Sequence, residues 1–186
     1  MPEDFKGIIK TFRSVFPGAT VWLGHTHAIL VGSVEPLKID FAEWEKNISK
    51  IGKDPVFYTN PYYLAATLML DNNIIEQFSE DIEINTDDLS YLEFFSPSCF
   101  DKDNLNKNIS FLSQNRADIN RTFNNIDDSE KMQRFIEGNR YFIKSVEFFQ
   151  NGEKQKSLNE LRTAVKVNPE NQEYPFLIKF YYGVPK

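Results

Sequence analysis

The most concentrated polar cluster of the chain is the run Asn85, Thr86, Asp87 and Asp88. Carboxylate and amide oxygens are suited to holding an amine or a divalent cation. The same residue types also form turns and cap the segment that follows them. The run therefore predicts one of two things, an amine- or cation-binding cluster or a polar turn.

His25 and His27 are the only two histidines of the sequence. Residues spaced by two on a strand face the same side of the sheet, so both imidazoles could reach one zinc or similar ion. Such a site needs a third ligand, and no acidic residue is adjacent in the sequence. The pair predicts either a small metal site or two turn histidines near a sheet edge.

No complete active site of a known kind is present in the sequence. It has eight glycines, and none of them forms a Gly-x-Gly-x-Gly loop after a strand. Cys99 is the single cysteine, so it forms neither an intrachain disulfide nor a zinc cluster, and a buried thiol is favoured over a nucleophile. We assign no catalytic residue and expect no cofactor for this chain by itself.

Composition and charge restrict the class of protein. The 186 residues are 41% hydrophobic, which is enough for a packed core, and the net charge of -6 disfavours a nucleic-acid partner. No apolar run approaches the roughly 20 residues that span a bilayer, and the amino terminus does not have the layout of a signal peptide. We expect a cytoplasmic protein.

The first half of the chain alternates helical and strand signals. Phe5, Ile8, Ile9, Phe12 and Phe16 form one helical stripe that ends at Pro17. Thr20–Leu23 and Ala28–Gly32 read as two strands of a hairpin, the second covered on both faces. Further segments are expected as a helix capped by Asp40 with Glu43, a helix from Tyr62 to Leu70, a helix from Ile74 to Phe78, and an extended stretch from Tyr91 to Phe95.

The second half reads as helices only. The expected helices are residues 104–115, a weaker one at 117–126, a long one capped by Ser129, Lys154–Val167, and Tyr174–Tyr182.

Residues 138–171 fit one tetratricopeptide-like unit, in which small residues let two antiparallel helices cross closely and large residues flank them. Gly152 lies in the turn and Pro169 closes the unit, whereas Lys144 stands where a leucine is usual. The pattern predicts either a protein-binding surface or a helical hairpin whose only role is packing within the fold. The candidate face consists of Tyr141, Ser145, Phe148, Ser157, Leu161 and Ala164.

The first hundred residues resemble the closing segment of the spermidine synthase-like family. The resembling residues are Thr11–Pro17, Val21–Trp22, Leu30–Ser33, Glu35–Leu37, Ile39–Asp40, Ile84–Asp88 and Leu92–Phe94. The resemblance is greatest to larger bacterial relatives in which a membrane part and helical repeats are joined to the synthase-like domain.

The resemblance implies a transferase fold that uses S-adenosylmethionine, or its decarboxylated form, in a full-length parent. In that family the last helix and antiparallel strand pair, matching Phe5–Gly32, close a seven-stranded sheet. The glycine loop, the ribose-binding acid and the catalytic aspartate belong to earlier strands, and nothing in this chain matches them. Leu23–His27 also replaces the Pro-Thr-Tyr-type segment that shapes the amine site, so the resemblance does not extend to polyamine specificity.

We therefore predict an α+β or α/β chain in which residues 1–100 close a Rossmann-like sheet and residues 101–186 form a helical tail. Its expected role is a non-catalytic carboxy-terminal portion of a spermidine synthase-like protein, which could itself be membrane-tethered. A stand-alone tetratricopeptide-like interaction module and a small metal-binding protein are the alternatives. The expected partners are the rest of the parent chain or a protein bound by the tail. We also have a mild preference for a homodimer, because the unpaired sheet edge near Thr20–Gly32 and the incomplete helical stack both favour self-association.

Overall fold

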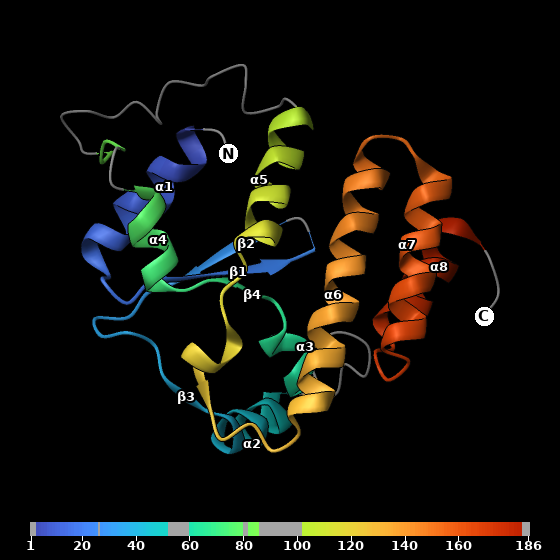
Figure 1. Ribbon diagram of the computed structural model, residues 1–186, viewed down its shortest axis with the longest axis horizontal. Coiled ribbons are helices and arrows are strands. Elements are labelled where there is room, and N and C mark those ends of the chain that lie inside the picture. Colours follow the sequence, from blue (N-terminus) through green and yellow to red (C-terminus); the bar gives the residue numbers. More distant parts are fainter. Residues whose placement is uncertain (1–2, 26, 52–59, 80–81, 86–101, 184–186) are drawn as a thin grey trace. The chain divides into compact units, whose positions relative to one another are not determined.

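The chain forms two units that interleave along the sequence, one within residues 1–37 and 68–122 and one within 38–67 and 123–186 (Figure 1). The computed structural model describes residues 3–25, 27–51, 60–79, 82–85 and 102–183. Within these ranges the fold is mixed α and β, with eight α-helices and a three-stranded antiparallel sheet. The boundary predicted at residue 100 and the stretch Tyr91–Phe95 lie outside the described residues.

The first unit is built on the sheet, whose strand order is β2-β1-β4. Its elements are α1 (Glu3–Val15), β1 (Thr20–Gly24), β2 (His27–Val31), β4 (Leu68–Leu70), α4 (Asn72–Ser79) and α5 (Lys102–Gln114), with a short 3-10 helix at Ile119–Arg121. The predicted opening helix and hairpin are confirmed, since β1 pairs antiparallel with β2 from Thr20↔Val31 to Gly24↔His27. Of the predicted helical stripe, Ile9 is fully buried whereas Ile8 is 40% exposed.

Two glycines fix the chain around this hairpin. Gly18 donates its backbone N–H to Ser33 O at 2.8 Å, and a Cβ on Gly18 would lie 1.9 Å from the carbonyl oxygen of Glu35. A Cβ on Gly32 would lie 2.7 Å from the ring of Phe16. The segment that follows β2 therefore packs directly on the turn that follows α1.

The strand β4 differs from the sequence prediction, which continued the helix from Tyr62 to Leu70. The helix α3 (Pro61–Ala65) instead ends early, and Thr67 folds back so that its N–H and its hydroxyl both donate to Leu64 O, at 3.1 and 2.7 Å. Leu68–Leu70 is buried and pairs with β1. Pairing with a buried strand outweighs the helix propensity of leucine and methionine, which is a weak local preference.

The second unit contains β3 (Ile39–Asp40), α2 (Phe41–Ile51), α3, β5 (Phe123–Asn124), α6 (Ser129–Gln150), α7 (Lys154–Val167) and α8 (Glu173–Tyr182). The predicted cap of α2 is present, since Glu43 N–H donates to Asp40 Oδ1 at 3.1 Å. The predicted cap of α3 is also present, with Tyr63 N–H donating to Asn60 Oδ1. The weak helix expected at 117–126 is wrong, because that segment contains the 3-10 helix and then β5, which pairs parallel with β3.

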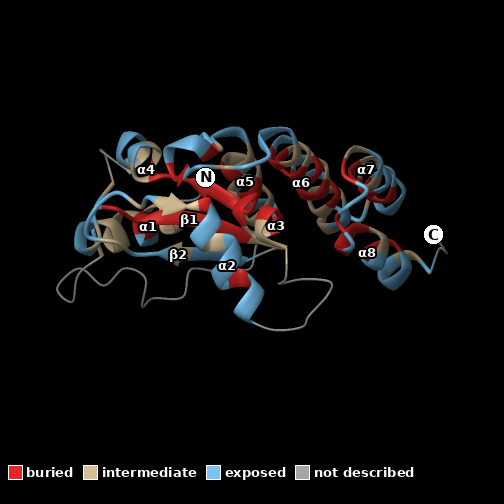
Figure 2. Ribbon diagram, turned by 90° about the horizontal axis from the view of Figure 1, so that it is seen from below, coloured by how far each residue is buried: buried red, intermediate tan, exposed pale blue. Residues whose placement is uncertain are grey.

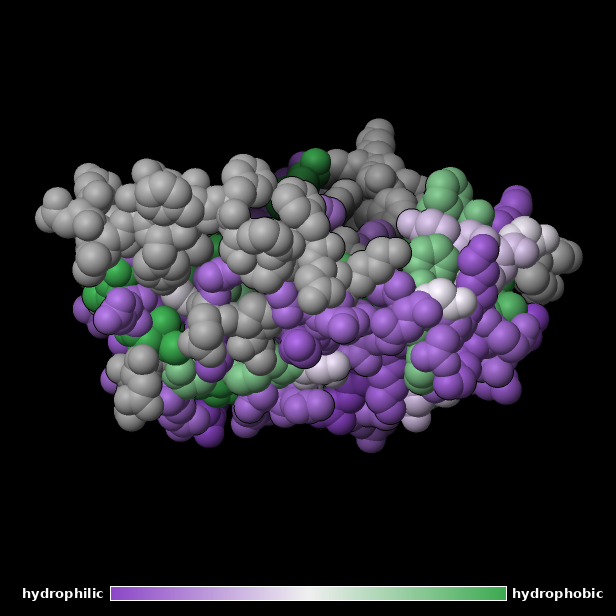
Figure 3. Space-filling model, turned by 90° about the horizontal axis from the view of Figure 1, so that it is seen from above, coloured by the Kyte–Doolittle hydropathy of each residue, from purple (hydrophilic) through white to green (hydrophobic). Residues whose placement is uncertain are grey.

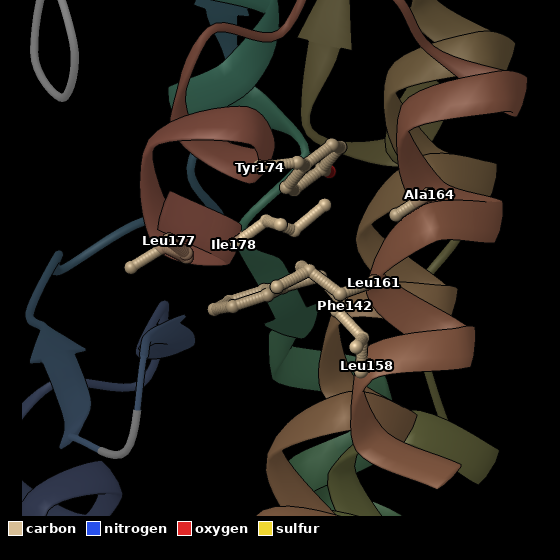
Figure 4. Close-up of a cluster of buried hydrophobic side chains, with 7 residues drawn as sticks. All are labelled: Phe142, Leu158, Leu161, Ala164, Tyr174, Leu177 and Ile178. Atoms are coloured by element: carbon tan, nitrogen blue, oxygen red, sulfur yellow. The ribbon is translucent and has the colours of Figure 1, made fainter. Parts of the chain in front are cut away.

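The core of α6, α7 and α8 is a cluster of seven buried side chains, drawn in Figure 4. Phe142 of α6 stacks on Tyr174 of α8, with ring centroids 5.8 Å apart. The cluster consists of Phe142, Leu158, Leu161, Ala164, Tyr174, Leu177 and Ile178. Because all three helices contribute to it, α8 belongs to the same packed stack as the helical hairpin.

Candidate functional site

The hairpin α6–α7 has the close helix crossing that the small residues of the sequence predict. Ser157 is 1% exposed, and its hydroxyl donates to the backbone oxygen of Ser145 at 2.6 Å. Ser157 Oγ also accepts from the hydroxyl of Tyr182 at 2.6 Å. This relay of two hydrogen bonds joins α6, α7 and α8, and larger side chains at Ser145 or Ser157 would push the helices apart.

Four residues of the predicted interaction face lie inside this hairpin. Ser145, Ser157, Leu161 and Ala164 are buried, with exposed fractions of 4% or less. Tyr141 and Phe148 are partly buried, and each ring is covered by a lysine ammonium group, Lys144 at 5.6 Å and Lys156 at 5.4 Å from the ring centroid. Only Tyr141 and Phe148 of the six predicted residues are therefore placed where a partner could reach them.

Gly138 marks the opposite end of the crossing. A Cβ there would lie 3.0 Å from Asn168 Cβ and 3.2 Å from the hydroxyl oxygen of Tyr174. Asn168 lies at the end of α7, directly before Pro169, and is fully buried. Gly138, the first residue of the predicted repeat, therefore packs closely against the end of α7 and the start of α8.

The outer strand β2 carries an apolar surface that the sequence prediction did not expect to be exposed. The strand was predicted to be covered on both faces, but Ile29 and Val31 expose 53% and 37% of their surface. Figure 2 shows β1 largely buried and β2 largely exposed. Among the described strands β2 pairs only with β1, whereas β4 on the other side receives hydrogen bonds from Ala117 N–H to Met69 O and from Arg116 Nε to Leu68 O.

The two histidines lie at the tip of this hairpin. His25 is in the turn with a φ of 50°, and His27 is the exposed first residue of β2, opposite Gly24. The two are therefore not neighbours on one strand, as the metal hypothesis supposes. Across the described ranges, no group of three or more His, Cys, Asp or Glu side chains is placed to hold a metal ion.

The polar run 85–88 is described only at its first residue. Asn85 donates its backbone N–H to Thr11 Oγ1 of α1 at 2.9 Å. Thr86, Asp87 and Asp88 lie outside the described residues. The amine- or cation-binding cluster stays a prediction.

A charged cluster around Tyr62 was missed by the sequence analysis. The buried Tyr62 hydroxyl donates to Asp127 Oδ1, and the Lys131 ammonium lies 4.7 Å from the centroid of the Tyr62 ring. Burial, together with the hydrogen bond to Asp127, raises the pKa of Tyr62 well above its usual value, and the same bond lowers the pKa of Asp127. Tyr62 also stacks on Phe135 of α6, so this cluster ties α3 to α6. The sequence separation of 65 between Tyr62 and Asp127 explains why no local signal could reveal the cluster.

Comparison with known proteins finds no relative: no family model matches the chain, and no curated protein and no solved structure is significantly similar. Within the described ranges, no helix is both long and apolar enough to cross a membrane.

Proposed function

We propose that this chain is the non-catalytic carboxy-terminal portion of a spermidine synthase-like protein, whose β2 edge completes the sheet of the transferase domain and whose helices offer an interaction surface. A sheet edge exposes a row of backbone N–H and C=O groups, which is a template for pairing with another strand. The observation that carries the proposal is the pair Ile29 and Val31, exposed on a strand with one described neighbour.

The composition of β2 supports this role. Its five residues, His27–Val31, include no lysine, glutamate or proline, the residues with which natural sheets protect a solvent-facing edge. The opposite side of the sheet is protected, since the segment at Arg116–Ala117 bonds to β4. A parent strand pairing with β2 would bury its apolar side chains together with the backbone groups that point away from β1.

The edge can be tested by hydrogen exchange on this chain alone. Alternate residues of an antiparallel strand turn their N–H groups away from the neighbour, so we expect alternate amides of β2 to exchange fast while those of β1 are protected. Equal protection along all of β2 and β1 would show that the edge is already occupied, which would remove the main support for the proposal.

The non-catalytic character has its own test, which is calorimetric titration with S-adenosylmethionine and with its decarboxylated form. We expect no saturable binding, because no glycine-rich nucleotide loop is present in the sequence. Saturable binding to this chain alone would contradict the proposal. A second test is the coding sequence upstream of Met1. The proposal predicts an in-frame segment there that contains a glycine-rich strand-to-helix turn.

The alternative is a stand-alone tetratricopeptide-like interaction module, which the hairpin geometry favours. The close crossing of α6 and α7 supports it, since the Ser157 hydroxyl bonds to the backbone of Ser145 and Gly138 packs closely on the end of α7. A pull-down compared between the native chain and a Tyr141→Ala, Phe148→Ala variant would test it. Loss of a bound protein in the variant supports the module, whereas a capture unaffected by these changes, or none at all, argues against it.

A further inference from the structure

The outer side of α8 and the last turn of α6 carry a run of four aromatic rings in contact, which we name the aromatic ladder. Consecutive centroids are 5.3 Å apart for Phe149 and Tyr181, 5.0 Å for Tyr181 and Phe180, and 5.8 Å for Phe180 and Phe176. The rings are exposed by 36% at Phe149, 54% at Tyr181, 68% at Phe180 and 40% at Phe176. On the face drawn in Figure 3, hydrophobic patches interrupt a mainly hydrophilic surface at the right-hand end of the view.

A helical stack normally ends in a polar outer face, because an apolar one promotes association. Helix α8 is the last helix of the described stack, and its inner face is buried through Tyr174, Leu177 and Ile178. Its outer face presents Phe176 and Phe180, spaced by four residues, with the exposed Lys179 beside them. The stack therefore ends in an apolar face, not a polar one.

We propose that a second copy of this chain covers the aromatic ladder, through a two-fold contact between the α8 helices. In such a contact two antiparallel copies of one helix bring Phe176 of each copy opposite Phe180 of the other, so the stripe is complementary to itself. The inference concerns a different surface from the β2 edge and does not depend on the proposed function.

The exposed area is consistent with this occupant. Together the four rings expose an area equivalent to about two whole aromatic side chains, or roughly 300–500 Å². A standard interface buries about 800 Å² on each partner. The ladder can thus supply about half of one protomer's share and would form the apolar core of a modest interface.

Charge permits a second copy on this side of the chain. The whole chain has a net charge of -6, which opposes association through most surfaces. Residues 129–183, which contain the ladder, carry nine basic and seven acidic side chains and are close to neutral. Two copies that meet through α8 therefore have little net charge on the segments that meet, and the long stem of Lys179 lets its ammonium group stay in solvent at the edge of the contact.

The test is the molar mass of the native chain by light scattering across a concentration series from about 1 to 200 µM, the range in which a modest interface is expected to associate. We expect the mass to approach twice that of the monomer, and the double variant Phe176→Ser, Phe180→Ser to weaken dimerisation at least tenfold. Val15→Ser, which replaces an exposed residue of α1, is the matched control and should leave the dimer unchanged. Circular dichroism of each variant checks that the helices are intact.

Two outcomes would overturn the proposal: a monomer at every concentration, or a dimer that the α8 variant leaves intact. A dimer that is lost in Ile29→Lys, and not in the α8 variant, would assign self-association to the β2 edge. Failure of the α8 dimer proposal can therefore be distinguished from failure of the proposed function of the β2 edge. Should the double variant not fold, cysteine cross-linking replaces it. In a Cys99→Ser background, Lys179→Cys is expected to form a disulfide-linked dimer on oxidation and the α7 control Lys166→Cys is not, and equal cross-linking of both would reject the α8 contact.

Discussion

At the scale of single residues, Gly18 leaves no room for a side chain. A methyl group there would meet the Glu35 carbonyl at 1.9 Å, and because that atom belongs to the backbone it cannot rotate away. We expect Gly18→Ala to lower the free energy of unfolding by about 2–3 kcal/mol, the upper part of the range for overpacking. Gly24→Ala is the control, since its nearest neighbour, Ile29 Cδ1, is 3.7 Å away. Equal urea midpoints for the two variants would mean that the loop at Glu35 moves freely.

Three carboxyl groups of the second unit have pKa values lowered by the hydrogen bonds they accept. Asp40 accepts from the Asn125 side chain and the Glu43 backbone, Asp127 from Tyr62, and Glu170 from Arg134 and Lys131. Each such group adds stability above its unfolded pKa of about 4 and loses it as the pH falls through the lower folded value.

We therefore expect the melting temperature to fall as the pH is lowered from about 5 to 3. Asp40→Ala should reduce both the melting temperature at pH 7 and the size of this fall, because the α2 cap and the Asn125 contact are lost together. Glu130→Gln, which removes an exposed carboxylate of α6, is the control. A melting temperature that rises toward pH 3 would contradict the assignment.

At the scale of elements, the α6–α7–α8 stack depends on one buried hydroxyl. Ser157→Ala removes the donor to Ser145 O and the acceptor of the Tyr182 hydroxyl, leaving two polar atoms without these partners. A loss of about 1–3 kcal/mol is expected, and Ser14→Ala, which removes an exposed hydroxyl bond on α1, should cost much less. Thermal denaturation compares the two, and equal losses would show that the relay contributes nothing beyond an ordinary surface bond.

Local sequence signals predicted some element bounds and missed others. The bounds of α7 were predicted at both ends because Asn151-Gly152 and Pro169 are local stop signals, and Gly152 takes a φ of 78°. Leu68–Leu70 was misread as helix because its strand pairing is with β1, more than 40 residues earlier. Of the candidate sites, local patterns found the hairpin and the edge strand, but the exposure of Ile29 and the Tyr62–Asp127 contact depend on tertiary structure.

At the scale of the whole molecule, the two units predict two cooperative patterns of native-state hydrogen exchange. Phe41 packs on Phe123 and Tyr62, and Tyr62 packs on Phe135, so residues far apart in sequence share one core. Amides of α2 should lose protection together with those of α6 as denaturant is added, and separately from those of β1. Joint opening of α2 with β1 would contradict the division.

The interleaving of the units has a consequence for synthesis on the ribosome. The backbone passes from one unit to the other near residues 37, 67 and 122. The segment Lys38–Thr67 emerges early, yet its core partners Phe123 and Phe135 are translated later, so Phe41 and Tyr62 can pack on each other but lack these two partners until then. The first unit can finish folding once residue 122 has emerged, so we expect the nascent chain to fold its sheet first. Until the later residues are made, the α2–α3 segment exposes apolar side chains. Chaperones bind surfaces of this kind.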